Sequence, residues 1–271
     1  MSGPPRPAPV GPSDPRIRSA IALRERKERD ASGLTLVDGA RELRRALESG
    51  AQVVEAFICE PLLAGEDARA ALDALRAGDV PMTTTTEAGF AKLAFGDRQE
   101  GLVAVVRAPS LALADLDLPV DPLVLVIESV EKPGNIGAVL RSADGAGVDA
   151  VIAASPRTDL ANPNVIRASA GTIFSVPMAA ASSAAVLAWL RERRIRTLAA
   201  RVDGAQAYTE ADLTGPVAIV VGSEAEGLTD AWTGPDIEAI HLPMSGIADS
   251  LNVSATAAIL FYEALRQRRA G

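Results

Sequence analysis

The chain has 271 residues, a length that suits one large or two medium-sized domains. Hydrophobic residues make up 48% of it, so it can bury a substantial core, and its net charge of −8 excludes a protein that coats itself with nucleic acid. Its single cysteine, Cys59, excludes an internal disulfide and a thiolate zinc cluster. No apolar run approaches the length of a membrane span. We therefore expect a cytoplasmic protein with no metal site and no membrane association.

The first part of the chain predicts a proline-rich tail followed by a small α/β domain. Residues 1–15 are expected to be disordered, and residues 16–30 predict an arginine-rich helix. Beyond them, short apolar runs alternate with amphipathic segments, which is typical of α/β folds. The expected strands are 34–39, 53–59 and 101–109, and the expected helices are 40–50 and 67–78. We assign residues 16–108 to this first domain.

A proline-containing stretch, residues 109–120, predicts a linker to a second α/β domain over residues 121–271. Its strands are apolar along much of their length, as a parallel sheet covered on both faces requires. The expected strands are 123–130, 150–155, 196–202, 217–224 and 238–243. The expected helices are 135–147, one within 164–175, 186–194 and 250–269.

Three segments of the second domain carry residues suited to chemistry. In the first, a strand ends near Glu128, Asn135 stands where it could cap the following helix, and Arg141 lies six residues further on. The carboxyl end of a parallel strand is the usual ligand position in open α/β sheets, although for this segment taken alone a capping asparagine and a solvated arginine are the commoner explanation. The segment lacks the G-x-G-x-x-G spacing of a dinucleotide site, which argues against a nucleotide-dependent oxidoreductase.

The second segment runs from an apolar strand into Gly222, Ser223 and Glu224, with Gly227 close behind. Glycines at a strand exit let a ligand approach the backbone, and Glu224 could balance a positive charge or could be an exposed turn residue. In the third segment, Ser250 is expected to cap the last helix. That places Asn252 inside an apolar helix, where its amide needs a partner.

Together these segments resemble the three motifs of the SpoU-type (TrmH-like) branch of the SPOUT methyltransferases. The first matches N-x-G-A-x-x-R-S-A from Asn135, and the second matches V-G-S-E-x-E-G-L from Val221. The third matches L-P-M-x-G-x-x-x-S-L-N-V-S from Leu242. The resemblance covers residues 123–268, and residues 24–107 more weakly resemble the substrate-binding domain that often precedes the catalytic one.

The resemblance implies an enzyme that uses S-adenosylmethionine to methylate a ribose 2′-hydroxyl in large-subunit ribosomal RNA. It also implies a homodimer, and a catalytic domain with a deep trefoil knot, which no residue pattern could reveal. Carried over by motif position, the catalytic residues are Asn135, Arg141, Glu224, Ser250 and Asn252. The cofactor-binding residues are Gly222, Leu242, Met244, Gly246, Leu251 and Val253.

In this family the arginine equivalent to Arg141 is the favoured candidate for the base that accepts the hydroxyl proton. Neutralising a guanidinium near pH 7, however, costs roughly 8 kcal/mol. We therefore expect Arg141 to orient the 2′-hydroxyl and the adjacent phosphate. The only histidine, His241, lies in an apolar strand and is expected to be structural. The RNA-binding residues are expected to be Arg24, Arg26, Lys27 and Arg167, although the first three would also suit a solvated helix.

Two alternatives remain from the sequence. The same fold could act on transfer RNA, or the chain could be a non-catalytic RNA-binding or ribosome assembly factor. The two-domain layout favours ribosomal RNA, and the complete set of motif residues favours an enzyme.

Overall fold

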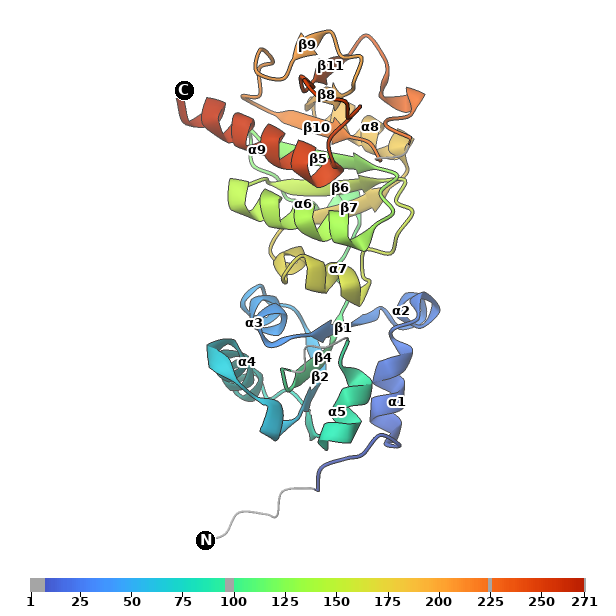
Figure 1. Ribbon diagram of the computed structural model, residues 1–271, viewed down its shortest axis with the longest axis vertical. Coiled ribbons are helices and arrows are strands. Elements are labelled where there is room, and N and C mark those ends of the chain that lie inside the picture. Colours follow the sequence, from blue (N-terminus) through green and yellow to red (C-terminus); the bar gives the residue numbers. More distant parts are fainter. Residues whose placement is uncertain (1–7, 96–99, 224–225, 271) are drawn as a thin grey trace. The chain divides into compact units, whose positions relative to one another are not determined.

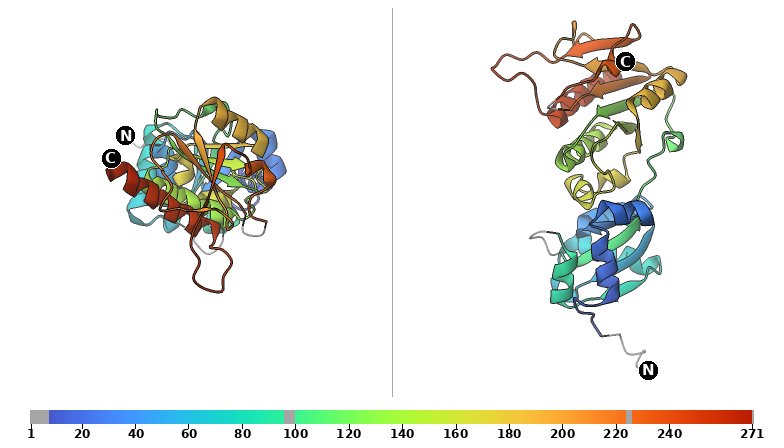
Figure 2. Two further views of the ribbon diagram at one scale, coloured as in Figure 1. Left: turned by 90° about the horizontal axis from the view of Figure 1, so that it is seen from above. Right: turned by 90° about the vertical axis from the view of Figure 1, so that its right-hand side faces the viewer.

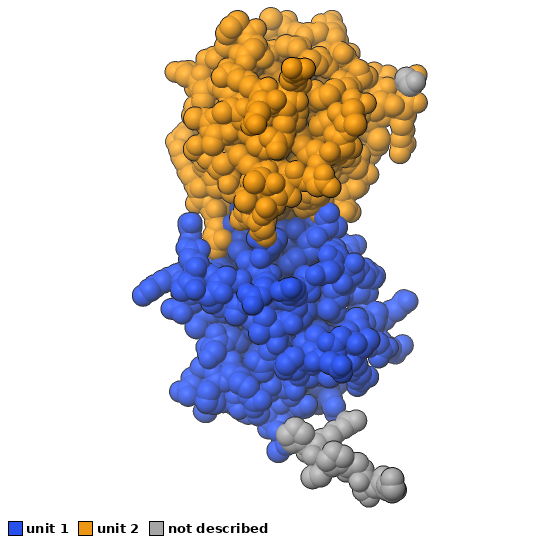
Figure 3. All heavy atoms as spheres, turned by 180° about the vertical axis from the view of Figure 1, so that it is seen from behind, with its two compact units in different colours: residues 1–109, 160–175 blue, residues 110–159, 176–271 orange. Residues whose placement is uncertain are grey.

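The computed structural model describes residues 8–95, 100–223 and 226–270, and the chain divides into two compact units. Unit 1 contains residues 1–109 and 160–175, and unit 2 contains residues 110–159 and 176–271 (Figure 3). The chain therefore leaves unit 2 after residue 159, contributes a short segment to unit 1, and returns at residue 176. Domain boundaries drawn from the sequence, with a continuous catalytic domain over 121–271, do not contain this excursion.

Unit 1 is built on a four-stranded mixed sheet with strand order β1-β4-β2-β3. Strand β4 pairs antiparallel with both β1 and β2, and β2 pairs parallel with β3. The strands are β1 (Leu34–Asp38), β2 (Val53–Ile58), β3 (Met82–Thr84) and β4 (Leu102–Arg107).

Helices cover both faces of this sheet because its strands alternate apolar side chains on the two sides. One face packs against α1 and α5, where Ile17 and Phe90 are fully buried with Phe57 and Val103. On the other face α3 packs against α4, and α3 contacts β1 and β4 (Figure 1). The helices are α1 (Pro15–Ala22), α2 (Arg26–Ser32), α3 (Ala40–Glu48), η1 (Glu60–Leu62), α4 (Gly65–Ala77) and α5 (Glu87–Leu93).

The structure corrects the sequence-based description of unit 1 in three places. The single helix expected over 16–30 is two helices, α1 and α2, because the chain turns between them. The tail expected to be disordered through residue 15 is already ordered at Val10, whose backbone bonds to Thr84 and Thr86; residues 1–7 lie outside the described chain. Strand β3 and helix α5 were not expected, because a three-residue strand and a seven-residue helix carry little periodicity.

The excursion to unit 1 contains α7 (Pro163–Ala168) and η3 (Thr172–Phe174). Two side chains of unit 1 bond to its carbonyl groups: Thr35 Oγ1 donates to Ala161 over 2.6 Å, and Arg45 Nη1 donates to Ala170 over 2.8 Å. The segment is therefore held by hydrogen bonds as well as by burial of Val165 and Ile166.

Unit 2 is built on a seven-stranded parallel sheet with strand order β7-β6-β5-β10-β8-β11-β9. The register of β10 on β5 runs from Val217 opposite Leu123 to Val221 opposite Ile127. The strands are β5 (Leu123–Glu128), β6 (Ala150–Ala154), β7 (Met178–Ala181), β8 (Arg196–Ala200), β9 (Gln206–Ala207), β10 (Val217–Val221) and β11 (Ile237–His241). This agrees with the expected parallel sheet.

Helices α6 (Pro133–Ala146) and α9 (Val253–Ala270) lie side by side on one face of this sheet, and α8 (Ser183–Glu192) lies on the other (Figures 1 and 2). The α8 face buries Trp189 and Trp232 among alternate residues of β5, β6 and β10. Short 3-10 turns complete the unit at η2 (Leu113–Asp115) and η4 (Asp230–Trp232). No helix in the described ranges of the chain combines the length and apolar character of a membrane span.

Candidate functional site

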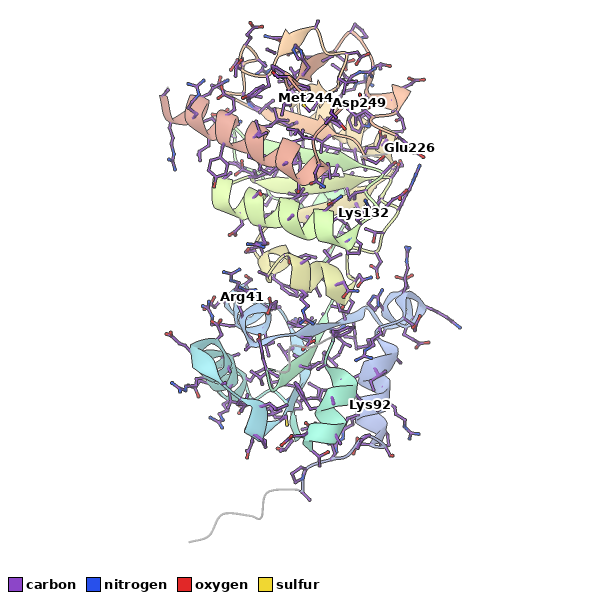
Figure 4. All side chains as sticks on the ribbon, in the orientation of Figure 1. Arg41, Lys92, Lys132, Glu226, Met244 and Asp249 are labelled. Carbon is purple, nitrogen blue, oxygen red and sulfur yellow. The ribbon has the colours of Figure 1, made fainter. Side chains whose placement is uncertain are left out.

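A cavity of about 480 Å³ opens in unit 2 beyond the carboxyl ends of β8, β10 and β11. This is where ligands bind in open parallel sheets, and the volume suits a small organic cofactor. The labelled side chains of Glu226, Met244 and Asp249 border it (Figure 4). The full lining is Ala200, Arg201, Val202, Asp203, Val221, Gly222, Ser223, Glu226, Gly227, Leu228, Leu242, Met244, Asp249, Ser250, Leu251, Val253 and Thr256.

Gly222, expected at the cofactor site, is in the wall of this cavity, where only a glycine fits. A Cβ atom at this position would lie 2.2 Å from the carbonyl carbon of Gly227 and 2.6 Å from the nitrogen of Leu228. The chain doubles back there, because Gly227 N donates to Ser223 O over 3.0 Å. The tight loop leaves its backbone groups close to the cavity, which supports the expected role of the second motif.

The loop that follows β11 forms another wall. Leu242, Met244, Leu251 and Val253, all expected at the cofactor site, line the cavity, as does Ser250. Gly246 belongs to the same loop but does not line the cavity, and a Cβ atom there would meet nothing within 4 Å. Met244 and Leu251 are each 37% exposed, so the loop presents apolar surface that unit 2 itself does not cover.

The cavity lining carries more negative than positive charge. Its carboxylates are Asp203, Glu226 and Asp249, and its only cation among the described residues is Arg201. Arg201 is already paired with Asp203 through Nε and Nη2, over 2.8 and 3.1 Å, and this hydrogen bonding lowers the pKa of the Asp203 carboxyl. The excess of carboxylates suits a ligand that carries positive charge.

Asn135 and Asn252, both expected to be catalytic, are brought together from residues 117 apart in sequence. The Nδ2 atom of Asn252 donates to Oδ1 of Asn135 over 3.3 Å. Asn252 Oδ1 in turn accepts a hydrogen bond from the backbone nitrogen of Ser254 over 2.9 Å and from its hydroxyl. The expected partner for the Asn252 amide is therefore present.

The helix starts differ from those expected from the sequence. Helix α9 begins at Val253, so Asn252, and not Ser250, caps it with its side chain. Helix α6 begins at Pro133, which places Asn135 in its first turn and not at the cap. At α9, Ser250 and Asn252 are both competent caps within one turn. At α6 the cap is Lys132, which makes no side-chain capping bond, and Pro133 starts the helix before Asn135.

Of the remaining two expected catalytic residues, the structure describes only Arg141. Arg141 lies on α6, about 9 Å along the helix axis from Asn135, is exposed, and donates no hydrogen bond to another described residue. Its guanidinium group is therefore available to a ligand. Glu224 lies outside the described residues.

Arg157 was not expected from the sequence, yet it joins two loops at the edge of the site. Its Nη2 bonds to Glu226 over 2.5 Å, and its Nη1 bonds to Glu131 over 2.7 Å. These bonds raise the pKa of Arg157 and lower that of Glu226, whose residue lines the cavity. Nothing in the local sequence distinguishes Arg157 from a solvated arginine, because its partners lie 26 and 69 residues away.

The four expected RNA-binding residues lie in unit 1 and differ in how free they are. Arg24 Nη2 donates to the carbonyl groups of Lys92, Leu93 and Ala94, which end helix α5, and its guanidinium lies 4.6 Å from the centre of the Phe95 ring. Arg26 pairs with Asp30 over 3.4 Å at the surface, and Lys27 is exposed.

Arg167 is engaged within unit 1 in a similar way. Its Nη1 donates to Phe95 O and lies 3.5 Å from Oδ2 of the buried Asp38. His241, expected to be structural, ends β11 half-buried, and its Nδ1 is buried without a partner in the described chain.

Comparison with known proteins identifies the family. The SpoU rRNA Methylase family matches residues 122–262, and the MRM3-like substrate binding domain matches residues 14–104. The chain belongs to the SpoU rRNA Methylase family. These matches fall on the two domains expected from the sequence, and the three motifs lie within the first match.

Individual relatives match nearly the whole chain. A 23S rRNA (uridine(2479)-2′-O)-methyltransferase of Streptomyces viridochromogenes is 30% identical over 92% of this chain and 88% of its own. A crystal structure of an RNA 2′-O ribose methyltransferase is 42% identical, with a TM-score of 0.82 over 94% of this chain and 96% of that one. The SpoU methyltransferase AviRb of Streptomyces viridochromogenes, solved with AdoMet, is 29% identical, with a TM-score of 0.86 over 95% and 99%.

Proposed function

We propose that this protein methylates a ribose 2′-hydroxyl of 23S ribosomal RNA, with S-adenosylmethionine as the methyl donor, in the cytoplasm. The single observation that carries the proposal is the cavity formed by the second and third SpoU motifs. Its volume, its close-packed glycine turn and its excess of carboxylates fit a cofactor with a positive sulfonium and an ammonium group. The names of the relatives support the RNA substrate and the 2′-O position.

The positions of the site residues suggest which of them hold the cofactor and which orient the reacting groups. S-Adenosylmethionine, when bound, supplies a methyl group on a sulfonium. The loops around Gly222 and Leu242 would hold it through backbone groups and the apolar side chains of Met244 and Leu251. In-line transfer to an oxygen depends mainly on positioning. Asn252 would contribute by orienting Asn135, to which it donates a hydrogen bond.

Arg141 is proposed to orient the 2′-hydroxyl and its neighbouring phosphate. Its guanidinium is exposed and has no hydrogen-bond partner among the described residues, so its planar donors are free for a phosphate. A role as base would require neutralising it, at roughly 8 kcal/mol near pH 7. We therefore propose that it stays charged while the proton leaves late in the reaction.

We also propose that the chain forms a homodimer and that the end of unit 2 is knotted. Apolar side chains left exposed on the β11–α9 loop and on α9 support the dimer: Met244, Ile247, Leu251, Ile259 and Tyr262. Strand β11 lies on the far side of β8 from β10, and after β11 the chain returns to α9, which packs against α6 and β10. This return supports the knot. Light scattering tests the dimer: a monomer at micromolar concentration would contradict it.

The function is tested first by calorimetric titration of the purified protein with S-adenosylmethionine. The wild type is expected to bind at one site per chain, and Gly222→Val to lose binding because its side chain would overlap the backbone of Gly227. Gly11→Ala is the control, since a Cβ atom there meets nothing within 4 Å. A folded wild-type protein that binds no S-adenosylmethionine would leave the non-catalytic RNA-binding alternative.

The substrate is tested next by mapping 2′-O-methyl groups after incubation with unmodified ribosomal RNA and, separately, with transfer RNA. Methylation of one nucleotide in 23S RNA is the expected result, and nucleoside analysis then distinguishes guanosine from uridine. Methylation of transfer RNA alone would replace the proposal by its alternative.

A further inference from the structure

Glu128 is a buried carboxylate that the proposed chemistry does not use. It is the last residue of β5, is 1% exposed, and carries hydrogen bonds on both of its oxygens. Oε1 accepts from the hydroxyls of Ser183 and Thr229 over 2.6 and 2.8 Å, and Oε2 accepts from the backbone nitrogen of Thr229 over 2.7 Å. A buried carboxylate is retained in a fold only where such donors satisfy it.

The partner Thr229 lies at one end of the loop that walls the cavity. This loop starts where β10 ends, at Val221, and its described residues Gly222, Ser223, Glu226, Gly227 and Leu228 all line the cavity. The first end is fixed because β10 is paired on both sides, with β5 and β8 (Figure 1). The second end passes directly from Leu228 to Thr229, so the bonds to Glu128 fix the position of that wall.

The two hydrogen bonds from Thr229 are shielded from water, which makes them stronger than ordinary surface bonds. The other donor to Glu128, Ser183, belongs to α8, which lies on the face of the sheet opposite α6 and α9 (Figure 2). Ser183 does not line the cavity. Glu128 therefore has one partner that belongs to the cofactor loop and one that does not. This difference makes its role testable.

We propose that Glu128 is a positioning residue for the cofactor: through Thr229 it holds Gly227 and Leu228 in the position that binds S-adenosylmethionine, without touching the ligand. The proposal rests on the proposed function of the cavity. It predicts that removing the acceptors weakens cofactor binding while leaving the transfer step intact. The negative charge of Glu128 is not required, because a glutamine in its place could accept from Thr229 N through its amide oxygen and donate to the two hydroxyls through its amide nitrogen.

The test compares four variants in calorimetric titration with S-adenosylmethionine and in methyl transfer. Glu128→Met keeps the length but loses the acceptors, and Thr229→Val loses one donor on the loop side. Glu128→Met is expected to raise the Kd by about tenfold or more, and Thr229→Val is expected to raise it by less. The kcat at saturating cofactor should stay within about threefold of wild type. Glu128→Gln should restore wild-type Kd.

Ser183→Ala is the matched control, because it removes a donor to the same carboxylate on the side away from the loop. It is expected to lower the melting temperature as Thr229→Val does, yet to leave Kd unchanged. Misfolded protein lowers the titration stoichiometry and not the Kd, which separates lost folding from lost positioning. Equal Kd changes in Ser183→Ala and Thr229→Val, or an unchanged Kd in folded Glu128→Met, would overturn the proposal.

Amide hydrogen exchange at Thr229 keeps the two proposals separable. Faster exchange in Glu128→Met than in wild type is expected with no ligand present, because the amide loses its acceptor. If the wild type bound no S-adenosylmethionine, the proposed function would fail, whatever exchange showed. If the wild type bound it and exchange at Thr229 were unchanged in Glu128→Met, only the role of Glu128 would fail.

Discussion

Asn252 donates a hydrogen bond to Asn135 over 3.3 Å while its own carbonyl oxygen caps helix α9. One amide therefore joins the first and third motifs of the family and starts the helix that packs against α6. The two ends of this amide can be tested separately, since the oxygen serves the helix and the nitrogen serves Asn135.

Asn252→Asp is expected to keep the fold and lose activity. Aspartate caps helices as well as asparagine, so the free energy of unfolding should change by less than about 0.5 kcal/mol. The nitrogen donor to Asn135 is lost, and turnover should fall by about tenfold or more. Asn252→Ala should also lose about 1 kcal/mol of stability, because the cap disappears. Urea denaturation and methyl transfer measure the two effects, and full turnover by Asn252→Asp would contradict this assignment.

Arg141→Lys tests the orienting role of the exposed arginine on α6. Lysine keeps the positive charge but loses the planar pair of donors that can hold a phosphate and a hydroxyl together. We expect turnover to fall by about a hundredfold, with cofactor affinity unchanged because Arg141 does not line the cavity. Turnover near that of wild type would contradict the orienting role, and a loss of cofactor binding would place Arg141 elsewhere in the site.

The sequence predicted those parts of the fold that depend on local pattern. The apolar run at Val217 to Val221 predicted the parallel strand β10, and the third motif placed Met244 and Leu251 at the cofactor site, where both line the cavity. The start of α9 was wrong by three residues, since Ser250 and Asn252 are both competent caps. The residue that does cap it, Asn252, also bonds to Asn135, a contact 117 positions away that no local pattern shows.

Contacts between remote residues could not be predicted from one sequence. Nothing near Glu128 indicates that Thr229 will bond to it, 101 positions away. Arg24 belongs to a run of basic residues that suggests an RNA-binding helix, yet the structure uses its guanidinium to end helix α5. Composition reports how many arginines a chain has, whereas only the fold decides which of them remain free.

Neutralising Arg24 should therefore cost much more stability than neutralising Lys27. Arg24→Gln removes the donors that hold three carbonyl groups and the contact with Phe95, and should cost about 1–3 kcal/mol of stability. Lys27→Gln removes an exposed charge and should change stability by less than about 0.5 kcal/mol. If Lys27 contacts an RNA phosphate, the salt dependence of RNA binding should lose about one unit of slope. An unchanged slope would remove Lys27 from the RNA-binding surface.

Asp38 should make unit 1 less stable as the pH rises. It ends β1, is 7% exposed, and accepts a hydrogen bond from Phe95 N over 2.6 Å. Burial raises the pKa of its carboxyl to about 6, although the bond from Phe95 and the charge of Arg167 oppose the rise. The folded pKa lies above the ordinary value of 3.8, so the folded chain binds more protons than the unfolded chain between these values, and stability falls as pH rises through that window.

Asp38→Asn should remove this dependence, because asparagine can still accept from Phe95 without burying a charge. Relative to wild type, the free energy of unfolding of the variant should increase by up to about 3 kcal/mol between pH 4 and pH 7. Denaturation followed by circular dichroism across this range measures the difference. Asp236→Asn is the control of opposite sign, because hydrogen bonding to Arg191 lowers the pKa of the Asp236 carboxyl. The wild type should therefore become more stable relative to Asp236→Asn as pH rises. A difference between wild type and Asp38→Asn that stayed constant with pH would show that the Asp38 carboxyl is not titrating in this window.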